Sequence, residues 1–380
     1  MVVSVDQSFI ENLMCNDINT FYEDLKKPLL NIKSSNNLYP LFADFTEYSP
    51  LHNGHLHCMV EAKKLHGDAL FVAVIPGLFE RNGRGQPYIM SRYMRAKTAI
   101  ETGADIVVEG PPMGIMGSGQ YSLCLAKMFK ALNADYIPRG YVDNDHKFKI
   151  ILSKINNGIG VAPKPYKIVS MEDNTILLNG KLKEDNYVIV SLSKSLTKIN
   201  FNFKDRFIFI PRIENVSGTK IREYSVTGKF DKLASMVPDT TLKILKKEIE
   251  NGHAPLHESR CNDFILDHAN NYSENHIRNL TLLDNKTKDN IIFNRPFSNI
   301  ESVINNIEHG FSRHQKLRIL SVLEAGILKD EIHKYINNYP QVIRILDYKN
   351  RDSLTKFKDN LNHNIIGDNR NIWQLMKMNS

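Results

Sequence analysis

The chain has 380 residues, 42% of them apolar and 24% charged, which is ordinary for a folded protein with room for more than one domain. No run reaches the roughly 18 uninterrupted apolar residues that cross a bilayer, and the N-terminus lacks the basic start and apolar core of a secretion signal. We therefore expect a cytoplasmic protein that does not contact membranes. Its four widely separated cysteines form no C-x-x-C pair, so we predict no protein metal site. The net charge of +7 is compatible with nucleic acid or phosphorylated ligands, although a solvated lysine-rich surface gives the same number.

Residues 1–38 are predicted to form a helical N-terminal extension whose apolar side chains can pack on another part of the chain. From residue 41 onward, short apolar runs alternate with helical patterns, which is typical of a parallel α/β sheet. The predicted strands are 41–45, 70–75, 105–108, 135–137, 187–192 and 207–210. The predicted helices between them are 54–66, 91–102 and 119–133, whereas 158–186 is predicted to be irregular. Residues 39–240 are therefore expected to form one Rossmann-like α/β domain.

After Pro238 only helical patterns remain, for instance 241–250, 298–309, 313–325 and 329–339. These patterns predict an all-helical C-terminal domain over residues 241–380. The fold class expected for the whole chain is therefore α/β, with a parallel sheet followed by a helical domain.

The stretch from Glu47 to His55 reads E-Y-S-P-L-H-N-G-H and joins the strand 41–45 to the helix that follows. A helix N-terminus has unpaired N–H groups and a partial positive charge, so it favours an anion. His52 and His55 are three residues apart and share one face of the first turn, and Gly54 between them has no Cβ to crowd a ligand. Alone, the pattern is equally compatible with a loop that carries two solvated histidines.

A second element, Ser217-Gly218-Thr219-Lys220-Ile221-Arg222, follows the strand 207–210 and begins another helical pattern. Its hydroxyl residues can cap the helix or turn their donors toward a phosphate, with Arg222 one turn further along. Lys220 is expected to point roughly 200° away from Arg222, toward solvent. Alone, a simple N-cap is the favoured interpretation.

Together, in this order, the two elements resemble the paired signature of the nucleotidyltransferase superfamily that is named after its H-x-G-H motif. The resemblance implies binding of ATP with Mg²⁺ and attack of a nucleophile on the α-phosphate, with release of pyrophosphate. It implies catalytic roles for His52, His55 and Arg222. The residues that it implies around the nucleotide are Glu47, Tyr48, Gly54, Gly110, Ser217, Gly218 and Thr219.

A closer resemblance is to the bacterial tRNA(Met) cytidine acetate ligase family, in which the first motif reads E-Y-N-P-F-H-N-G-H. The similarity continues through residues 77–87, 92–96 and 339–346, although Ser49, Leu51 and Leu78 depart from the family pattern and its S-P-N-N segment is missing. A divergent member is therefore expected. The resemblance implies a ligase that activates acetate as acetyl-adenylate and acetylates the wobble cytidine of elongator tRNA-Met, with tRNA bound by the helical domain.

Basic residues outside the motifs are further candidates for contacts with substrate or RNA, although such residues are more often structural or solvated. They are Arg81, Arg92 and Arg95 in the first domain and Arg313, Lys316 and Arg318 in the second. Asp44 can bind magnesium or cap its loop, and the cap is favoured. Two other functions stay open: a small-molecule adenylyl- or cytidylyltransferase of cofactor synthesis, and a non-catalytic RNA-binding protein on the same core. The sequence does not predict an oligomeric state.

Overall fold

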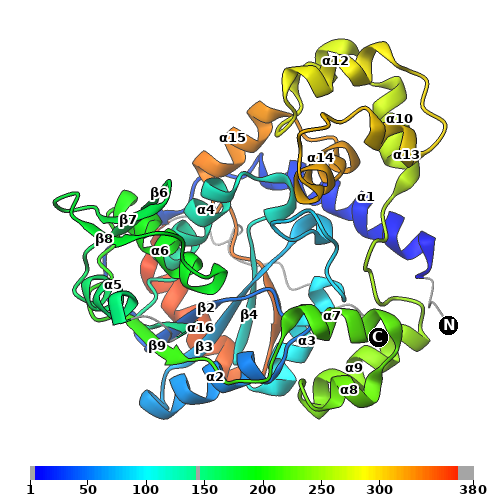
Figure 1. Ribbon diagram of the computed structural model, residues 1–380. Helices are drawn as coiled ribbons and strands as arrows, with labels where there is room; N and C mark the ends of the chain where they lie inside the picture. The colour runs from blue at the N-terminus through cyan, green and yellow to red at the C-terminus, as the bar shows by residue number, and fades with distance from the viewer. Residues whose placement is uncertain (1–4, 143–145, 367–380) are drawn as a thin grey trace.

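The computed structural model describes residues 5–142 and 146–366 (Figure 1). The strands are β1 (Asn31–Ile32), β2 (Leu41–Phe45), β3 (Leu70–Pro76), β4 (Ile106–Gly110), β5 (Ile137–Tyr141), β6 (Val161–Lys164), β7 (Lys167–Ser170), β8 (Ile176–Asn179), β9 (Phe207–Pro211), β10 (Ile345–Tyr348) and β11 (Ile365–Ile366). The helices of the first half are α1 (Gln7–Asp24), α2 (Asn53–Leu65), α3 (Arg92–Thr102), α4 (Ser118–Ala131), α5 (His146–Asn156) and α6 (Glu184–Lys198), with short 3-10 helices η1 (Leu78–Glu80) and η2 (Met113–Ile115). Those of the second half are α7 (Gly218–Thr227), α8 (Phe230–Ala234), α9 (Asp239–Glu250), α10 (Asn262–Asn271), α11 (Glu274–Asn279), α12 (Asn285–Phe293), α13 (Ile300–Asn305), α14 (Arg313–Ala325), α15 (Lys329–Asn338) and α16 (Arg351–Asn364).

A Rossmann-like parallel sheet lies at the centre of the fold (Figure 1). β2, β3 and β4 are parallel neighbours, and β10 is added antiparallel to the outer edge of β4. On the other side of β2, a parallel bridge between Phe42 and Tyr136 leads to β5, which pairs in parallel with β9. From β2, the chain first adds β3 and β4 on one side of this strand and later adds β5 and β9 on its other side. Open α/β sheets bind ligands at such a switch point, here between β2 and β5.

Alternating residues of the central strands contribute to two hydrophobic cores. Leu41 and Phe45 of β2 belong to a large cluster that includes Met128 of α4, whereas Phe42 lies in a second cluster with Met59 of α2. Both faces of the sheet are therefore covered by helices, as expected for parallel strands.

The mixed α/β fold with a helical C-terminal region agrees with the sequence-based expectation, and the predicted strands 41–45, 70–75, 105–108 and 207–210 are present within one or two residues. The predicted strand 187–192 is wrong, because these residues lie in α6. Buried Ile189, Ser193 and Leu196 repeat at helical spacing, which the short apolar run conceals. Residues 158–186 are not irregular. They contain the antiparallel sheet β6-β7-β8, whose edge strand tolerates Pro163.

The domain bounds expected from the sequence also need correction. The helical region, which comprises α7 to α15, is followed by a return of the chain to the central sheet. There Ile345 of β10 pairs with Val108 of β4. β11 pairs with β1 near the other end of the chain. Position 240 is not a break in packing, because Leu233 and Leu245, on either side of it, share one hydrophobic cluster.

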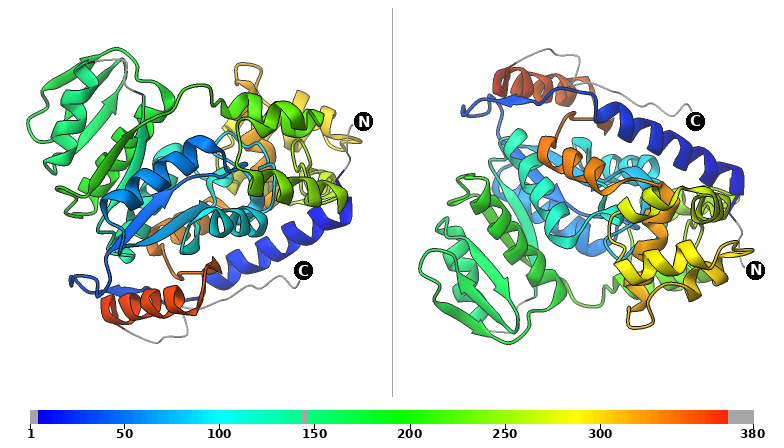
Figure 2. Two further views of the ribbon diagram at one scale, coloured as in Figure 1. Left: turned by 90° about the horizontal axis from the view of Figure 1, so that it is seen from below. Right: turned by 90° about the horizontal axis from the view of Figure 1, so that it is seen from above.

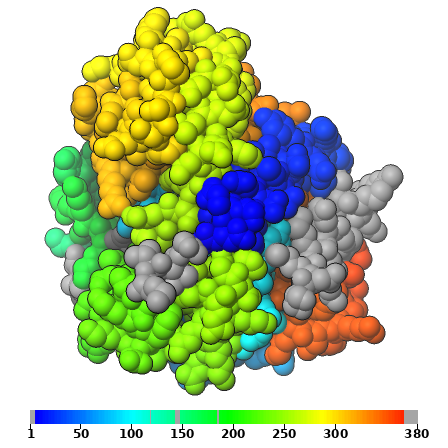
Figure 3. All heavy atoms as spheres, turned by 90° about the vertical axis from the view of Figure 1, so that its right-hand side faces the viewer, coloured from blue at the N-terminus to red at the C-terminus, as the bar shows by residue number. Residues whose placement is uncertain are grey.

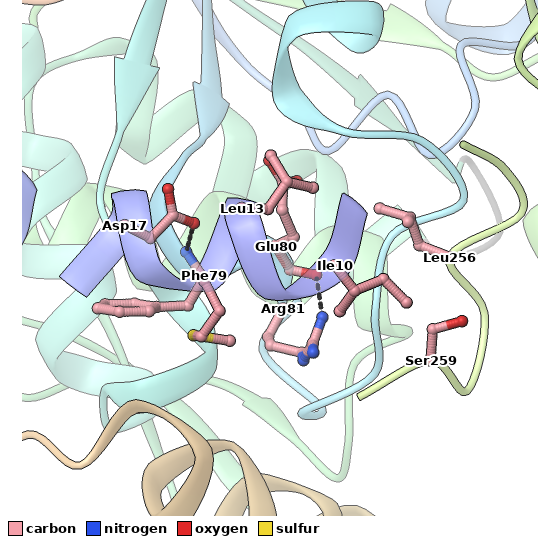
Figure 4. A pocket seen from close by; sticks show the side chains of 9 residues that line it. Ile10, Leu13, Asp17, Phe79, Glu80, Arg81, Leu256 and Ser259 are labelled. Carbon is pink, nitrogen blue, oxygen red and sulfur yellow. Dashed lines mark hydrogen bonds between the residues drawn. The ribbon is translucent and has the colours of Figure 1, made fainter. Parts of the chain in front are cut away.

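The N-terminal helix α1 is part of the core and not a separate extension. Phe21 is fully buried and stacks on Tyr335 of α15 with ring centroids 5.0 Å apart. The carboxylate of Asp17 accepts a hydrogen bond of 2.6 Å from the N–H of Phe79 (Figure 4). Beside them is a void of about 10 Å³, which has room for about one water molecule. Figure 3 shows α1 (blue) lying against the helical region (yellow and yellow-green).

Buried ion pairs connect α1 to the sheet and to α3. Arg92 is 1% exposed and contacts Asp17 at 2.6 Å, Glu109 of β4 at 2.8 Å and Glu80 of η1 at 3.0 Å. Arg344, just before β10, pairs with Glu109 and with Asp24 of α1. Five segments that are distant in sequence are thus joined by one charge network.

We expect Arg92→Met to lower the free energy of unfolding by about 3–5 kcal/mol, because Asp17 would keep a buried charge without its partner. Urea unfolding followed by circular dichroism measures the change. The control is Lys64→Met, since Lys64 and Glu61 form an exposed pair whose loss should hardly shift the midpoint. Equal midpoints for Arg92→Met and the wild type would contradict a stabilising role for the network.

Candidate functional site

A cavity of about 530 Å³ lies at the switch point between β2 and β5. Its lining comes mainly from the end of β2 with the loop after it, the first turns of α2, the loop 82–86, the end of β5 and the start of α7. This volume is within the range of small-molecule sites in proteins. The two sequence motifs are distant in the chain but contribute to one cavity, since it is lined by His52, His55, Gly218, Thr219 and Arg222.

At the N-terminus of α2, the ring of each histidine is hydrogen-bonded to the backbone of the other. His52 is the N-cap, and its Nδ1 accepts the N–H of His55 at 3.4 Å, while Nδ1 of His55 accepts the N–H of His52 at 3.3 Å. The rings stack with centroids 3.6 Å apart. A Cβ on Gly54 would lie 3.1 Å from the His52 ring, so the glycine lets the ring lie against the backbone.

Both rings are held in the neutral form. Burial lowers the pKa of His52 to about 4, and the charges of Arg212 and Arg222 act in the same direction. Burial and the neighbouring His52 ring lower the pKa of His55 well below its ordinary value. Because each Nδ1 accepts a hydrogen bond, the proton of each neutral ring is on Nε2. Two Nε2–H donors therefore belong to the cavity wall.

The second motif forms the N-terminus of α7. Ser217 is the N-cap, and its hydroxyl accepts the N–H of Lys220 at 3.4 Å. Gly218, Thr219 and Arg222 line the cavity, whereas Lys220 is exposed. A helix of ten residues thus directs its N-terminus toward the cavity. With α2, two helix N-termini favour an anion at the same place.

Sequence reasoning missed two arginines of the cavity, Arg139 in the middle of β5 and Arg212 just after β9. Arg139 donates to the carbonyl of Phe45 at 2.6 Å and approaches Asp44 at 3.3 Å. Burial raises the pKa of Asp44 to about 6, although the Arg139 charge opposes the shift. Arg139 pairs with Phe209 within the parallel β5–β9 register, and Arg212 directly follows the last pair of that register, Tyr141 with Pro211. For Arg212, a basic residue just after the predicted strand 207–210 was the available signal.

Several predicted site residues lie outside the described lining of the cavity. Tyr48 is buried, and its ring packs edge-to-face against the His55 ring with centroids 5.1 Å apart. Ser217 is used as the helix cap. Gly110 is a packing residue, because an added Cβ would lie 3.0 Å from the carbonyl oxygen of Ile75.

The basic candidates outside the motifs also lie elsewhere. Arg81 pairs with Glu324 at 2.6 Å, and Arg92 and Arg95 are fully occupied by buried carboxylates and carbonyls, so the expectation that these three contact substrate is corrected. In α14, Arg318 donates to the carbonyl of Met116 and Arg313 lies 3.3 Å from Glu258, whereas Lys316 is partly exposed.

Anion-binding helix N-termini at a switch point are typical of α/β proteins that bind nucleotides. Two family models match the chain: HIGH Nucleotidyl Transferase over residues 43–153, and Cytidyltransferase-related C-terminal region over residues 143–347. An uncharacterized protein of Methanocaldococcus jannaschii is 47% identical over 332 residues, which are 86% of this chain and 91% of that protein. The chain belongs to the HIGH nucleotidyltransferase family of enzymes.

The resemblance to tRNA(Met) cytidine acetate ligases is confirmed as a distant homology. The ligase of Acetivibrio thermocellus is 25% identical over 350 residues, 80% of this chain and 82% of that protein. The ligase of Kosmotoga olearia is 27% identical over 260 residues, 58% of this chain and 59% of that protein. A crystal structure of Thermotoga maritima TmcAL bound with alpha-thio ATP matches with a TM-score of 0.66 at 22% identity over 84% of each chain, which shows a shared fold.

We expect nitrogen NMR of the ligand-free protein to report His52 as a neutral ring with the proton on Nε2 at about pH 5.5. The resonance is assigned by its loss in His52→Gln. Folding lowers the pKa of His52 from 6.5 to about 4. As the pH falls from 6.5 toward 4, the unfolded chain takes up a proton on His52 before the folded protein does, so the contribution of His52 to stability is lost. A doubly protonated His52 ring at that pH would contradict the description of the site.

Proposed function

We propose that the protein is an ATP-dependent ligase that activates acetate as acetyl-adenylate and transfers the acetyl group to the wobble cytidine of elongator tRNA-Met in the cytoplasm. The observation that carries the proposal is the meeting of both helix N-termini, the neutral histidines and Arg222 in one cavity. The names of the distant relatives support the choice of acetate and of a tRNA cytidine. No helix in the described parts of the chain is long and apolar enough to span a membrane.

The charges of the cavity suit a polyphosphate. Arg139, Arg212 and Arg222 bring positive charge to its wall, and the two Nε2–H groups add directed donors that need no proton uptake. In the proposed complex, His52 and His55 donate to the β- and γ-phosphates, while Arg222 and the start of α7 contact the α-phosphate. Transfer at phosphorus depends mainly on positioning and charge stabilisation, so a site built from donors is sufficient.

The proposed reaction has two steps. A carboxylate oxygen of acetate attacks the α-phosphorus of ATP, the bond from that phosphorus to the bridging oxygen breaks, and pyrophosphate leaves. The exocyclic amine of cytidine then attacks the acyl carbon, AMP leaves with the bonding electrons, and the amine loses a proton. Neither step uses a protein nucleophile.

Magnesium would accompany the triphosphate. Among the described residues, no group of three or more His, Cys, Asp and Glu could hold a metal ion. Two carboxylates, Asp44 and Glu47, do line the cavity. Mg²⁺ is commonly bound by one or two carboxylates together with substrate phosphates, so these residues fit an ion that arrives with ATP and neutralises phosphate charge.

The loop 82–86 also lines the cavity and offers polar side chains for the acid or the acceptor. The loop is held by its own hydrogen bonds. Oδ1 of Asn82 accepts the N–H of Arg84 at 2.9 Å and that of Gln86 at 3.1 Å. A loop with a defined conformation in the cavity wall is what an enzyme needs to orient a second substrate against ATP.

We expect acetate-dependent exchange of labelled pyrophosphate into ATP, without tRNA. His55→Ala and Arg222→Ala should each lower the exchange rate by roughly 100-fold, because each removes a donor that stabilises developing charge. Lys220→Ala is the matched control on α7, and its rate should stay close to that of the wild type, since Lys220 is exposed.

Two results would contradict the proposal. If the pyrophosphate exchange rate of His55→Ala stayed within threefold of the wild-type rate, His55 would have no role in the reaction. Pyrophosphate release that requires a phosphorylated small molecule and ignores acetate would instead identify a small-molecule nucleotidyltransferase.

A further inference from the structure

The positive charge of the chain is concentrated in one module, residues 146–206, which contains α5, the sheet β6-β7-β8 and α6. The module carries 11 Lys and Arg against 5 Asp and Glu, a net charge of +6, whereas the whole chain has a net charge of +7. It lies beside the central sheet on the side away from the helical region (Figure 1, Figure 2). The rest of the chain is therefore nearly neutral. A lysine-rich surface spread evenly over the whole protein does not explain this concentration of positive charge.

Three lysines of this module lie near Tyr166, whose ring is exposed: Lys164 and Lys167 flank it along the chain, and Lys181 lies over its ring. Lys164 and Lys167 are partners across the β6–β7 pair, and Tyr166 between them is 73% exposed. The carbonyl of Tyr166 accepts the N–H of Gly180 at 2.6 Å, which brings the end of β8 alongside. Nζ of the next residue, Lys181, lies 5.4 Å from the centroid of the Tyr166 ring.

Two lysines of α6 extend this surface. Lys194 and Lys198 are four residues apart and so share a helix face. Burial lowers the pKa of Lys194, and the charges of Lys198 and Lys164 lower it further. The lysines of α6 and of β6 are therefore close enough to repel one another. None of Lys164, Lys167, Lys181, Lys194 and Lys198 forms an ion pair within the described residues. Grouped like charges destabilise a fold, and a bound polyanion would relieve their repulsion.

We call Lys164, Lys167, Lys181, Lys194, Lys198 and Tyr166 the lysine patch. Its helix α6 also reaches the cavity, because Val188 is part of the cavity lining. Lys198 is ten residues further along, which corresponds to roughly 15 Å of helix. An extended polyanion that lies on the patch can therefore also reach the cavity.

We propose that the lysine patch binds the acceptor RNA, with the lysines on backbone phosphates and the Tyr166 ring stacked on an unpaired base. This inference rests on the proposed function, for which it names the surface that holds the RNA. Lysines bind phosphates as point charges, and exposed aromatic rings stack on unpaired bases. The patch takes the place of the α14 residues expected from the sequence, where Arg313 and Arg318 already have protein partners.

The first test compares two triple variants with equal loss of charge. Lys164→Gln/Lys167→Gln/Lys181→Gln changes the patch, and Lys26→Gln/Lys33→Gln/Lys334→Gln changes exposed lysines elsewhere. The probe is a fluorescently labelled elongator tRNA-Met transcript, and anisotropy gives its Kd over a series of salt concentrations. We expect the patch variant to weaken binding roughly tenfold or more at about 100 mM salt and to reduce the slope of log K against log salt by roughly two to three. Binding by the control variant should stay within about twofold of the wild type.

Equal Kd values for the patch variant and the wild type would overturn the inference, as would equal weakening in both triple variants. Tyr166→Ala tests the stacking. It should weaken binding of the transcript roughly fivefold or more but leave a fully paired RNA duplex unaffected, because only an unpaired base can stack on the ring. An equal effect on both RNAs would overturn the role of Tyr166.

Acetate-dependent pyrophosphate exchange without RNA separates this inference from the proposed function. The patch variant should retain the wild-type exchange rate, since its lysines lie outside the described cavity lining. If the wild type does not catalyse exchange, the proposed function fails. If exchange is intact and the patch variant still binds tRNA like the wild type, only the inference fails.

Discussion

Arg95 connects the buried ion pairs of the core to the loop that carries the two histidines. Its guanidinium is fully buried, contacts Glu80 at 3.0 Å, and donates to the carbonyls of Glu47 and Pro76, both at 2.8 Å. Glu80 in turn pairs with Arg92. Movement of the backbone at Glu47 would therefore remove one hydrogen bond from a buried guanidinium, which is costly. This bond anchors the start of the loop that carries the histidine donors, and donors held in place before a ligand binds are what electrostatic stabilisation of a reaction requires.

The same network explains why α1 and the segment before β10 pack against the sheet. Glu109 of β4 pairs with Arg92 and Arg344, and these arginines also pair with Asp17 and Asp24 of α1. Gly77 makes room for this carboxylate, because an added Cβ would lie 2.1 Å from Cγ of Glu109. The N-terminal helix is thus a structural part of the nucleotidyltransferase core, although it lies outside the cavity.

Local patterns in the sequence were sufficient for the elements that carry the motifs. The strand 41–45, the helix after it and the capped helix at Ser217 are each encoded by neighbouring residues. The return of β10 to β4 was not predictable in this way, because Ile345 and Val108 are 237 residues apart. Arg92 and Arg95 were expected to contact substrate or RNA, but nothing local identifies the acidic partners that bury them. A strand predicted to end at residue 137 likewise gives no reason to place Arg139 within β5 and in the cavity lining.

One cavity is proposed to join ATP, acetate and a tRNA cytidine. The most direct measurement is mass spectrometry of nucleosides from an elongator tRNA-Met transcript after incubation with the protein, ATP, Mg²⁺ and isotopically labelled acetate. We expect labelled N4-acetylcytidine at the wobble position, with pyrophosphate and AMP released in equal amounts and no label in a parallel reaction with Arg222→Ala. Consumption of ATP by the wild type without any label in the tRNA would contradict the proposal.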